Sequence, residues 1–342
     1  MTDGMVGGRA HGLRERDHAS VWYLFLTLVS FASLVPFVVM PLASHVVANG
    51  ETLFIVSAII FLGSNFHVAL TGWFYTDSEM LTHFRARPVR YLLVPSLLIP
   101  GSAAAFYLLD RSVSIYLVMA FFGWQLWHYQ KQNVGLLSFI AAGTDGTPLS
   151  IWERRTLMLA AVTGILGFFA LGQTGAPALS TEFAVLYQIG LAISWLLPVV
   201  FCIAIVKCAA LRTNWLRLGF FLFGTLFFMP TFLFSEQMSA LSAYALSHGL
   251  QYFVFMGFVS VGKKKPVASL IKLLLIAAIG GVILDHVRWA PKWPDFQYGY
   301  AVYGAFVGIV MTHFVLDAGI WRLREQFQRR YMREKFYFVF NR

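Results

Sequence analysis

Four histidines lie inside long apolar stretches of the chain: His67, His128, His248 and His313. A polar side chain inside a membrane-spanning segment is costly and is a functional candidate by default. Neutral imidazole and carboxylate together are typical ligands of iron, zinc, copper and manganese. Asp317 follows His313 by four residues, so both side chains lie on one helix face and reach one ion, or the carboxylate orients the imidazole. We therefore predict one metal-binding centre made of these four histidines and Asp317.

Two glutamines share helix faces with these histidines. Gln132 follows His128 by four residues, and Gln251 follows His248 by three. Residues at these spacings are neighbours on a helix surface. We expect both amides to act as hydrogen-bond donors that hold the imidazoles or a bound water in place.

Three more polar residues follow the stretch that carries His67. Asp77, Glu79 and His83 lie where this stretch leaves the apolar region. One hypothesis is that they complete the metal shell or relay protons to it from the cytoplasm. The alternative is an ordinary solvated loop.

A metal ion inside an apolar bundle favours oxidation of a lipophilic substrate, such as an acyl lipid, an isoprenoid, a carotenoid or a quinone, because water for hydrolysis is scarce. A non-haem iron site fits this donor set and implies an electron donor as a further partner. The chain carries no phosphate loop, dinucleotide fingerprint or nucleophile elbow. In type it resembles the histidine-rich membrane oxygenases and desaturases and, more loosely, the bacterial carotene-cleaving dioxygenases. The HxxxH and HxxHH boxes of desaturases do not occur, so no family and no residue roles are assigned from this resemblance.

Other functions use the same residues. A proton- or ion-coupled transporter would use the histidines and Asp317 as a relay. Transporters often show broken helices in matching halves, which Pro100-Gly101 and Pro230 do not provide. A membrane electron carrier would use pairs of histidines as axial ligands of haem. In a purely structural role, each histidine would form a hydrogen bond between two helices.

The composition shows what must position these residues. The 342-residue chain is 58% hydrophobic and 12% charged, with a mean hydropathy of +0.67, which is too little charge for the surface of a soluble protein of this size. We predict an all-α integral membrane protein with a single transmembrane domain over residues 1–342. About ten spanning helices are expected from apolar stretches of roughly 20 residues. They cover 22–47, 52–75, 91–109, 113–141, 156–172, 183–206, 216–235, 238–261, 268–285 and 299–320.

The basic residues orient this bundle. With the N-terminus in the cytoplasm, all but four of the 26 Lys and Arg residues lie on the cytoplasmic side. Arg111, Arg288 and Lys292 lie outside, and Lys131 lies within a span. This asymmetry predicts that both termini are cytoplasmic, in a bacterial-type inner membrane. It also accounts for the net charge of +10 by orientation and attraction to membrane lipids, without a nucleic-acid partner.

This orientation makes the four histidine-bearing spans run in one direction, from outside to inside, with their imidazoles at comparable depth. Residues 1–20 are expected to form a polar cytoplasmic N-terminus that is retained as an anchor. Residues 321–342 mix arginine with Phe and Tyr and are expected to form a basic-aromatic cytoplasmic tail. Such a tail lies on an anionic leaflet as a helix or is solvated. Cys202 and Cys208 are too far apart along one helix to form a disulfide.

Overall fold

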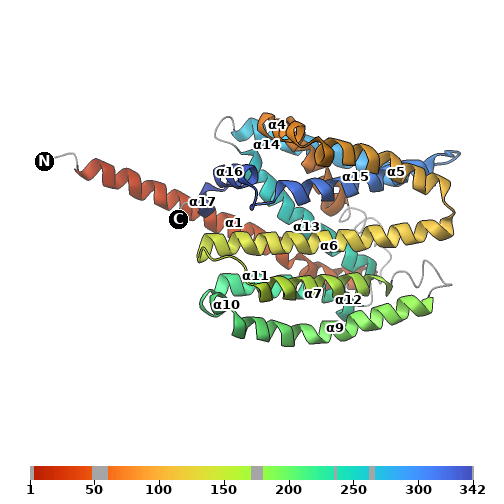
Figure 1. Cartoon of the computed structure of the whole chain (residues 1–342), viewed down its shortest axis with the longest axis horizontal. Coiled ribbons are helices and arrows are strands. Elements are labelled where there is room, and N and C mark those ends of the chain that lie inside the picture. Colours follow the sequence, from red (N-terminus) through yellow and green to blue (C-terminus); the bar gives the residue numbers. More distant parts are fainter. Residues whose placement is uncertain (1–3, 48–60, 171–179, 235–236, 262–265, 341–342) are drawn as a thin grey trace.

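The structure, a computed structural model, describes residues 4–47, 61–170, 180–234, 237–261 and 266–340. Helices that run roughly along one common axis make up this part of the chain (Figure 1), and no strand occurs within it. The prediction of an all-α bundle is confirmed for these residues. The expected span 52–75 is described only from residue 61, and the lysines 263–265 lie outside the described residues.

The long helices coincide with the predicted spans. Most boundaries agree within a few residues, although α1 begins well before its expected span and the segment expected at 216–235 is divided into two helices. The long helices are α1 (Gly4–Val47), α5 (Val94–Leu108), α6 (Arg111–Thr144), α7 (Ile151–Phe168), α9 (Ser180–Lys207), α11 (Trp215–Leu226), α13 (Gln237–Ser260), α14 (Pro266–Arg288) and α15 (Gly299–Ile320). The short ones are α3 (His67–Leu70), α4 (Ser78–Ala86), α10 (Ala209–Thr213), α12 (Pro230–Leu233), α16 (Gln326–Lys335) and α17 (Tyr337–Phe340).

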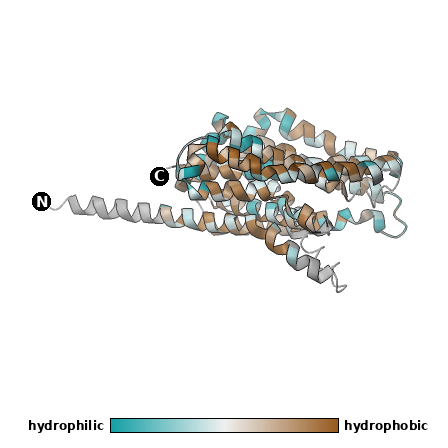
Figure 2. Ribbon diagram, turned by 90° about the horizontal axis from the view of Figure 1, so that it is seen from below, coloured by the Kyte–Doolittle hydropathy of each residue, from teal (hydrophilic) through white to brown (hydrophobic). Residues whose placement is uncertain are grey.

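Five segments of the described helices are long and apolar enough to cross a membrane. These are His18–Val39, Val89–Leu108, Thr181–Lys207, Pro266–Arg288 and Gly299–Ile320. Figure 2 shows apolar residues along most of the helices, and side chains such as Leu97 and Trp195 are largely exposed on the surface. Helices α6 and α13 are also long enough, but their buried polar residues lower their mean hydropathy. The structure thus supports a membrane protein with five such segments, fewer than the ten expected.

The second expected span is not a regular helix. Phe61–Phe66 forms a π-helical turn, α3 provides one α-helical turn, and Thr71–Thr76 continues as a 3-10 helix. Gly63 in the π-helical turn lies against Gly249 of α13, so closely that a Cβ on either glycine would overlap backbone atoms of the other segment. Irregular backbone at membrane depth is tolerated where neighbouring protein covers it. This contact brings the segment that carries His67 against the helix that carries His248.

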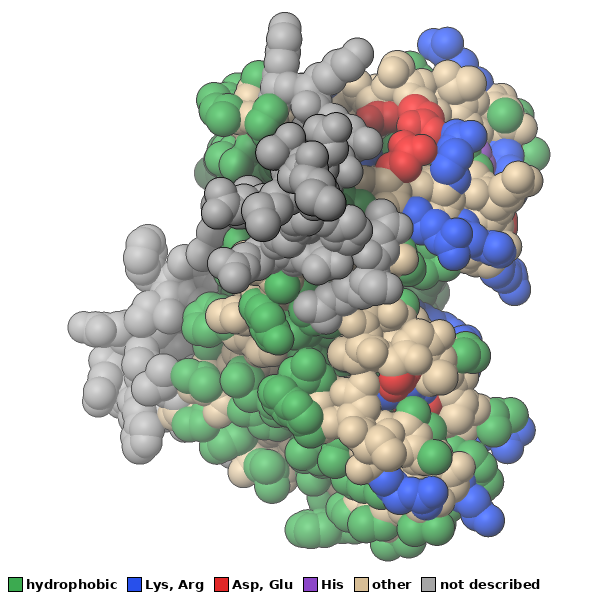
Figure 3. All heavy atoms as spheres, turned by 90° about the vertical axis from the view of Figure 1, so that its left-hand side faces the viewer, with side chains coloured by type: hydrophobic (Ala, Val, Ile, Leu, Met, Phe, Trp, Pro, Cys, Tyr) green, Lys and Arg blue, Asp and Glu red, His purple; other side chains and the backbone are tan. Residues whose placement is uncertain are grey.

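The C-terminal tail packs against the bundle. Helices α16 and α17 bury Tyr331, Phe336 and Phe338, and Phe336 contacts Phe139 of α6 and Phe255 of α13 at ring-centroid distances of 5.1 and 5.5 Å. The aromatic residues of the tail therefore belong to the core, whereas the sequence suggested a surface helix or a solvated segment. Figure 3 views this end of the molecule and shows Lys and Arg side chains along one side of it, with a few acidic side chains among them.

A buried ion cluster joins the loops at the same end. The guanidinium of Arg217, at the start of α11, donates to Glu153 at 2.7 and 2.8 Å and to Asp145 at 2.9 and 3.0 Å. Burial acts to raise the pKa of Glu153, but hydrogen bonds from Arg217 and Ser150 outweigh it and hold this pKa below its ordinary value. The cluster ties α7 and α11 to the end of α6.

Candidate metal centre

The structure brings the four predicted histidines together. His67 on α3, His128 on α6, His248 on α13 and His313 on α15 are all buried. The centroids of the four rings form a quadrilateral. Its sides measure 4.6 Å from His67 to His248, 4.9 Å from His248 to His128, 5.0 Å from His128 to His313 and 4.9 Å from His313 to His67. One diagonal, from His248 to His313, measures 6.4 Å. Four elements that are distant in sequence thus place their imidazoles in one cluster.

These distances match those of imidazoles around one ion. A metal–nitrogen bond of about 2.0–2.1 Å puts the ring centre about 3.2 Å from the metal. Rings at right-angle positions are then about 4.5 Å apart and rings at opposite positions about 6.4 Å apart. The observed sides and diagonal lie close to these values.

Asp317 belongs to the same cluster. Its Oδ2 atom lies 3.8 Å from Nε2 of His128 and 3.7 Å from Nε2 of His313. Ligand atoms that share one ion at right angles are about 3.0 Å apart, so an ion would draw each of these two nitrogens toward Oδ2 by less than 1 Å. Two overlapping ligand groups result, each with its atoms within 4.8 Å of one another: His67, His248 and His313, and His128, His313 and Asp317.

The cluster also contains polar atoms that lack partners. The Nε2 atoms of His67, His128 and His313 and both ring nitrogens of His248 are buried without a hydrogen-bond partner among the described residues. Buried polar atoms in folded proteins are nearly always hydrogen-bonded, and each exception needs an explanation. A shared cation would account for the Nε2 atoms of His67, His128 and His313 and for one of the two nitrogens of His248, since an imidazole gives a single nitrogen to one ion.

Hydrogen bonds on the far side of two rings fix which nitrogen is free. Tyr252 donates from its hydroxyl to Asp317 Oδ1 at 2.9 Å, so its oxygen accepts from the Thr71 hydroxyl, which lies 3.0 Å away. Thr71 then accepts from Nδ1–H of His313 at 2.6 Å. His67 likewise places Nδ1 on the carbonyl oxygen of Gly63. Both rings are thereby held in the tautomer that leaves Nε2 with a bare lone pair, as a metal ligand requires.

The two glutamines support the helices of the site and do not touch its rings in the described contacts. Gln132 donates to the backbone oxygen of His248 at 3.0 Å and to the side-chain oxygen of Gln251 at 2.8 Å. Gln251 donates to Ser33 of α1 at 3.0 Å and to Asn133 at 3.3 Å. The expected role as donors to the imidazoles is therefore not found. The pair joins α1, α6 and α13 around the cluster.

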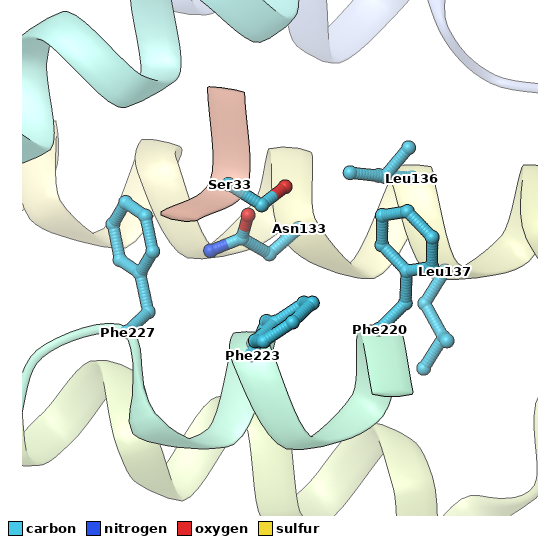
Figure 4. A pocket seen from close by; sticks show the side chains of 8 residues that line it. Ser33, Asn133, Leu136, Leu137, Phe220, Phe223 and Phe227 are labelled. Atoms are coloured by element: carbon cyan, nitrogen blue, oxygen red, sulfur yellow. The ribbon is translucent and has the colours of Figure 1, made fainter. Parts of the chain in front are cut away.

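A small void adjoins this amide network. Ser33 and Asn133 face the phenylalanine rings of α11 across it (Figure 4), and its volume of about 10 Å³ is about that needed for one water molecule. It is too small for a substrate.

Asp77 and Glu79 lie at the tail and not at the cluster. Asp77 caps the start of α4 by accepting from the backbone N–H of Glu79 at 3.0 Å, and its other oxygen accepts from Tyr331 at 3.4 Å. Glu79 pairs with Arg330 of α16 at 2.6 Å. Neither acidic residue belongs to the two ligand groups found among the described residues.

His83 also contacts the tail. Its ring stacks on Phe327 with 4.0 Å between centroids and 2° between planes, and Gln328 Nε2 lies 3.3 Å from its Nε2. Burial lowers the pKa of His83 below its ordinary value of 6.5, and Arg87 lowers it further. The structure thus places His83 in the contact between α4 and α16, and His83 belongs to neither of the two candidate ligand groups.

Sequence reasoning missed Thr71 and Tyr252. Each follows a clustered histidine by four residues, as Gln132 and Asp317 also do. The shared spacing places a second polar layer one helical turn nearer the charged end than the histidines. This repeated spacing was a usable signal in the sequence.

Aromatic rings enclose the cluster. Tyr129 lies 4.3 Å from the ring of His248, and Phe314 lies 4.5 Å from that of His128. These rings keep water away from the imidazoles, which strengthens the interaction of the imidazoles with a cation. No known protein family, curated protein or solved structure matches this chain.

Proposed function

We propose that this protein is a membrane-embedded metal-dependent oxidoreductase with a non-haem iron centre. The observation that carries the proposal is the set of buried imidazole nitrogens without partners, at least one on each of the four rings, beside Oδ2 of Asp317. His128, His313 and Asp317 form the two-histidine, one-carboxylate set that non-haem iron oxygenases use. His67 and His248 complete the donors on the other side. Bound iron would supply activation of dioxygen at a coordination position that these five donors leave open.

The geometry favours a single ion over haem. A haem lies flat between its axial imidazoles, whose centres are then about 6.4 Å apart. Only His248 and His313 have this separation among the measured pairs. The rings of His67 and His128 each lie within 5.0 Å of both and occupy the space that the macrocycle needs.

The substrate is proposed to be a lipophilic molecule that arrives from the membrane, such as an acyl lipid, an isoprenoid or a carotenoid. His128 is the most exposed of the four rings, at 9%. Trp124 and Trp127 lie on the outer face of the same helix and are each 37% exposed. This aromatic face leads from the membrane side to the edge of the cluster and suits an apolar chain.

The proposal places about ten helices across a bacterial-type inner membrane with both ends in the cytoplasm. Its support is the gathering of Lys and Arg at one end (Figure 3). At the opposite end, Arg111 lies over the ring of Tyr300, and Arg288 and Lys292 lie over Trp289. Such cation–aromatic pairs are typical of a membrane–water interface.

Metal analysis tests the centre directly. The detergent-purified protein should carry about one iron per chain, and His313→Ala and His128→Ala should lose it, since each removes a ligand. His83→Ala is the matched control, because it removes a buried histidine outside the cluster and should retain the metal. Metal-free wild-type protein after reconstitution with Fe²⁺, Zn²⁺ and Mn²⁺ would overturn the proposal and favour the relay of a transporter.

A second measurement tests the chemistry. Iron-loaded protein incubated with a membrane lipid extract, a reductant and oxygen should yield oxidised lipids by mass spectrometry, and the His313→Ala protein should not. A metal-loaded protein that oxidises no acyl, isoprenoid or carotenoid lipid would retain the metal centre and refute the oxidoreductase.

A further inference from the structure

A groove at the charged end lies outside the metal centre. It has a volume of about 720 Å³, within the usual range for ligand sites. Two segments that are far apart in sequence form it: residues 86–94, between α4 and α5, and residues 315–325, which end α15 and lead into the tail. Both the charge and the apolar character of its walls restrict what it accommodates.

The charge of the groove is positive. Arg87, Arg90 and Arg322 line it together with one acidic residue, Glu325. The carboxylate of Glu325 lies between two of the guanidinium groups, at 2.5 Å from Arg87 and 3.6 Å from Arg322. Three arginines and one glutamate leave two positive charges uncompensated within the groove. Arg322 is further held by donating from Nε to the backbone oxygen of Ala318 at 2.7 Å.

The remaining wall is apolar and continues along the outside of the bundle. Val89 and Val94 line the groove, and Val89 is 64% exposed. Below them Leu92, Leu93 and Leu97 are also exposed on the outer surface. The groove therefore lies where the apolar segment Val89–Leu108 begins, at the level where headgroups meet hydrocarbon in a membrane.

We propose that this groove binds one anionic phospholipid. Its phosphate lies between Arg87, Arg90 and Arg322, because guanidinium groups bind phosphate oxygens in pairs. Its acyl chains follow the exposed leucines at the start of α5. A soluble anion satisfies the arginines but leaves the apolar surface unused, whereas a neutral lipid satisfies only the apolar surface. The proposal is independent of the metal centre.

Native mass spectrometry of the full-length protein in a neutral detergent tests this site. Phosphatidylglycerol should bind more tightly than phosphatidylcholine with the same acyl chains. Arg87→Gln/Arg90→Gln should weaken phosphatidylglycerol binding about thirty-fold, since each basic residue near a headgroup contributes about a fivefold factor. Glu325→Gln should tighten binding, because it removes the competing carboxylate.

A second pair of arginines provides the matched control. Arg154 and Arg155 are exposed at the start of α7, at the same end of the molecule (Figure 1), and Arg154→Gln/Arg155→Gln removes equal charge away from the groove. This control should leave lipid binding nearly unchanged. Equal losses in the two double variants, equal binding of the two lipids, or weaker binding in Glu325→Gln would overturn the site. Displacement of the lipid by an excess of inorganic phosphate would also overturn it, as a free anion would then be the ligand.

Discussion

Substitution of Thr71 by valine tests whether the hydrogen-bond chain behind His313 prepares the ring for metal binding. Valine has nearly the same shape as threonine but accepts no hydrogen bond. The change removes the acceptor 2.6 Å from His313 Nδ1 and the donor 3.0 Å from the Tyr252 hydroxyl. The ring is then free to adopt the other tautomer, whose Nε2–H cannot bind a metal.

The expected size follows from the two lost bonds. Each buried hydrogen bond contributes about 1 kcal/mol, so the loss of two corresponds to about 2 kcal/mol. This is a factor of about 30 in affinity and lies within the range of about 10–100 that is typical for partners behind a metal ligand. Tyr252→Phe, which keeps the Thr71 hydroxyl, should have a smaller effect.

Competition with a chelator measures the affinity of the purified protein for the metal. Thr71→Ser restores the hydroxyl and should bind the metal within a few-fold of the wild type. Circular dichroism and size-exclusion chromatography establish that each variant is folded. Wild-type affinity in Thr71→Val, or equal losses in the serine and valine variants, would refute the role assigned to the hydroxyl.

Three further predictions concern the scaffold. Gly249→Ala should lower the free energy of unfolding by about 1–3 kcal/mol, because its Cβ overlaps the backbone of Gly63, whereas Gly257→Ala on the same helix meets open space and should be neutral in a denaturant titration. Because burial lowers the pKa of His83, the docked tail favours the neutral ring. Its stabilisation is complete above the ordinary pKa of 6.5 and decreases as the pH falls from there toward the lowered value. The protection factors of the α16 amides, which correct for the intrinsic pH dependence of exchange, should therefore fall below about pH 6. Unchanged protection factors, or the same change in His83→Gln, would contradict this. Reporter fusions after Asp145 and at the C-terminus should both report a cytoplasmic location, and an external signal at either would contradict the proposed topology.

Much of the fold follows from the sequence because lipid simplifies the problem. A backbone in hydrocarbon must satisfy its own hydrogen bonds, so an apolar stretch of about 20 residues becomes a helix wherever it lies in the chain. This is why most of the predicted spans agree with α5, α6, α9, α13, α14 and α15 within a few residues. The irregular backbone around His67 could not be predicted from the sequence, since its π-helical turn depends on the contact with α13. The buried tail did not follow either, because its aromatic residues suit a membrane surface as well as a core.

The sequence by itself determined which residues could do chemistry: imidazoles and a carboxylate at membrane depth, where only function or pairing repays their desolvation. Only the tertiary structure decided that His67, His128, His248, His313 and Asp317 lie together, because helix spacing fixes the face of a residue but not the partner that this face meets. The same holds for the predicted supporting residues. In the folded chain, Gln132 and Gln251 bond to each other, to the backbone of His248 and to polar side chains of α1 and α6. Asp77, Glu79 and His83 contact the C-terminal tail. Contacts between elements also placed the hydroxyls of Thr71 and Tyr252 behind His313, because the four-residue spacing from a histidine fixes their helix face but not the ring that this face meets.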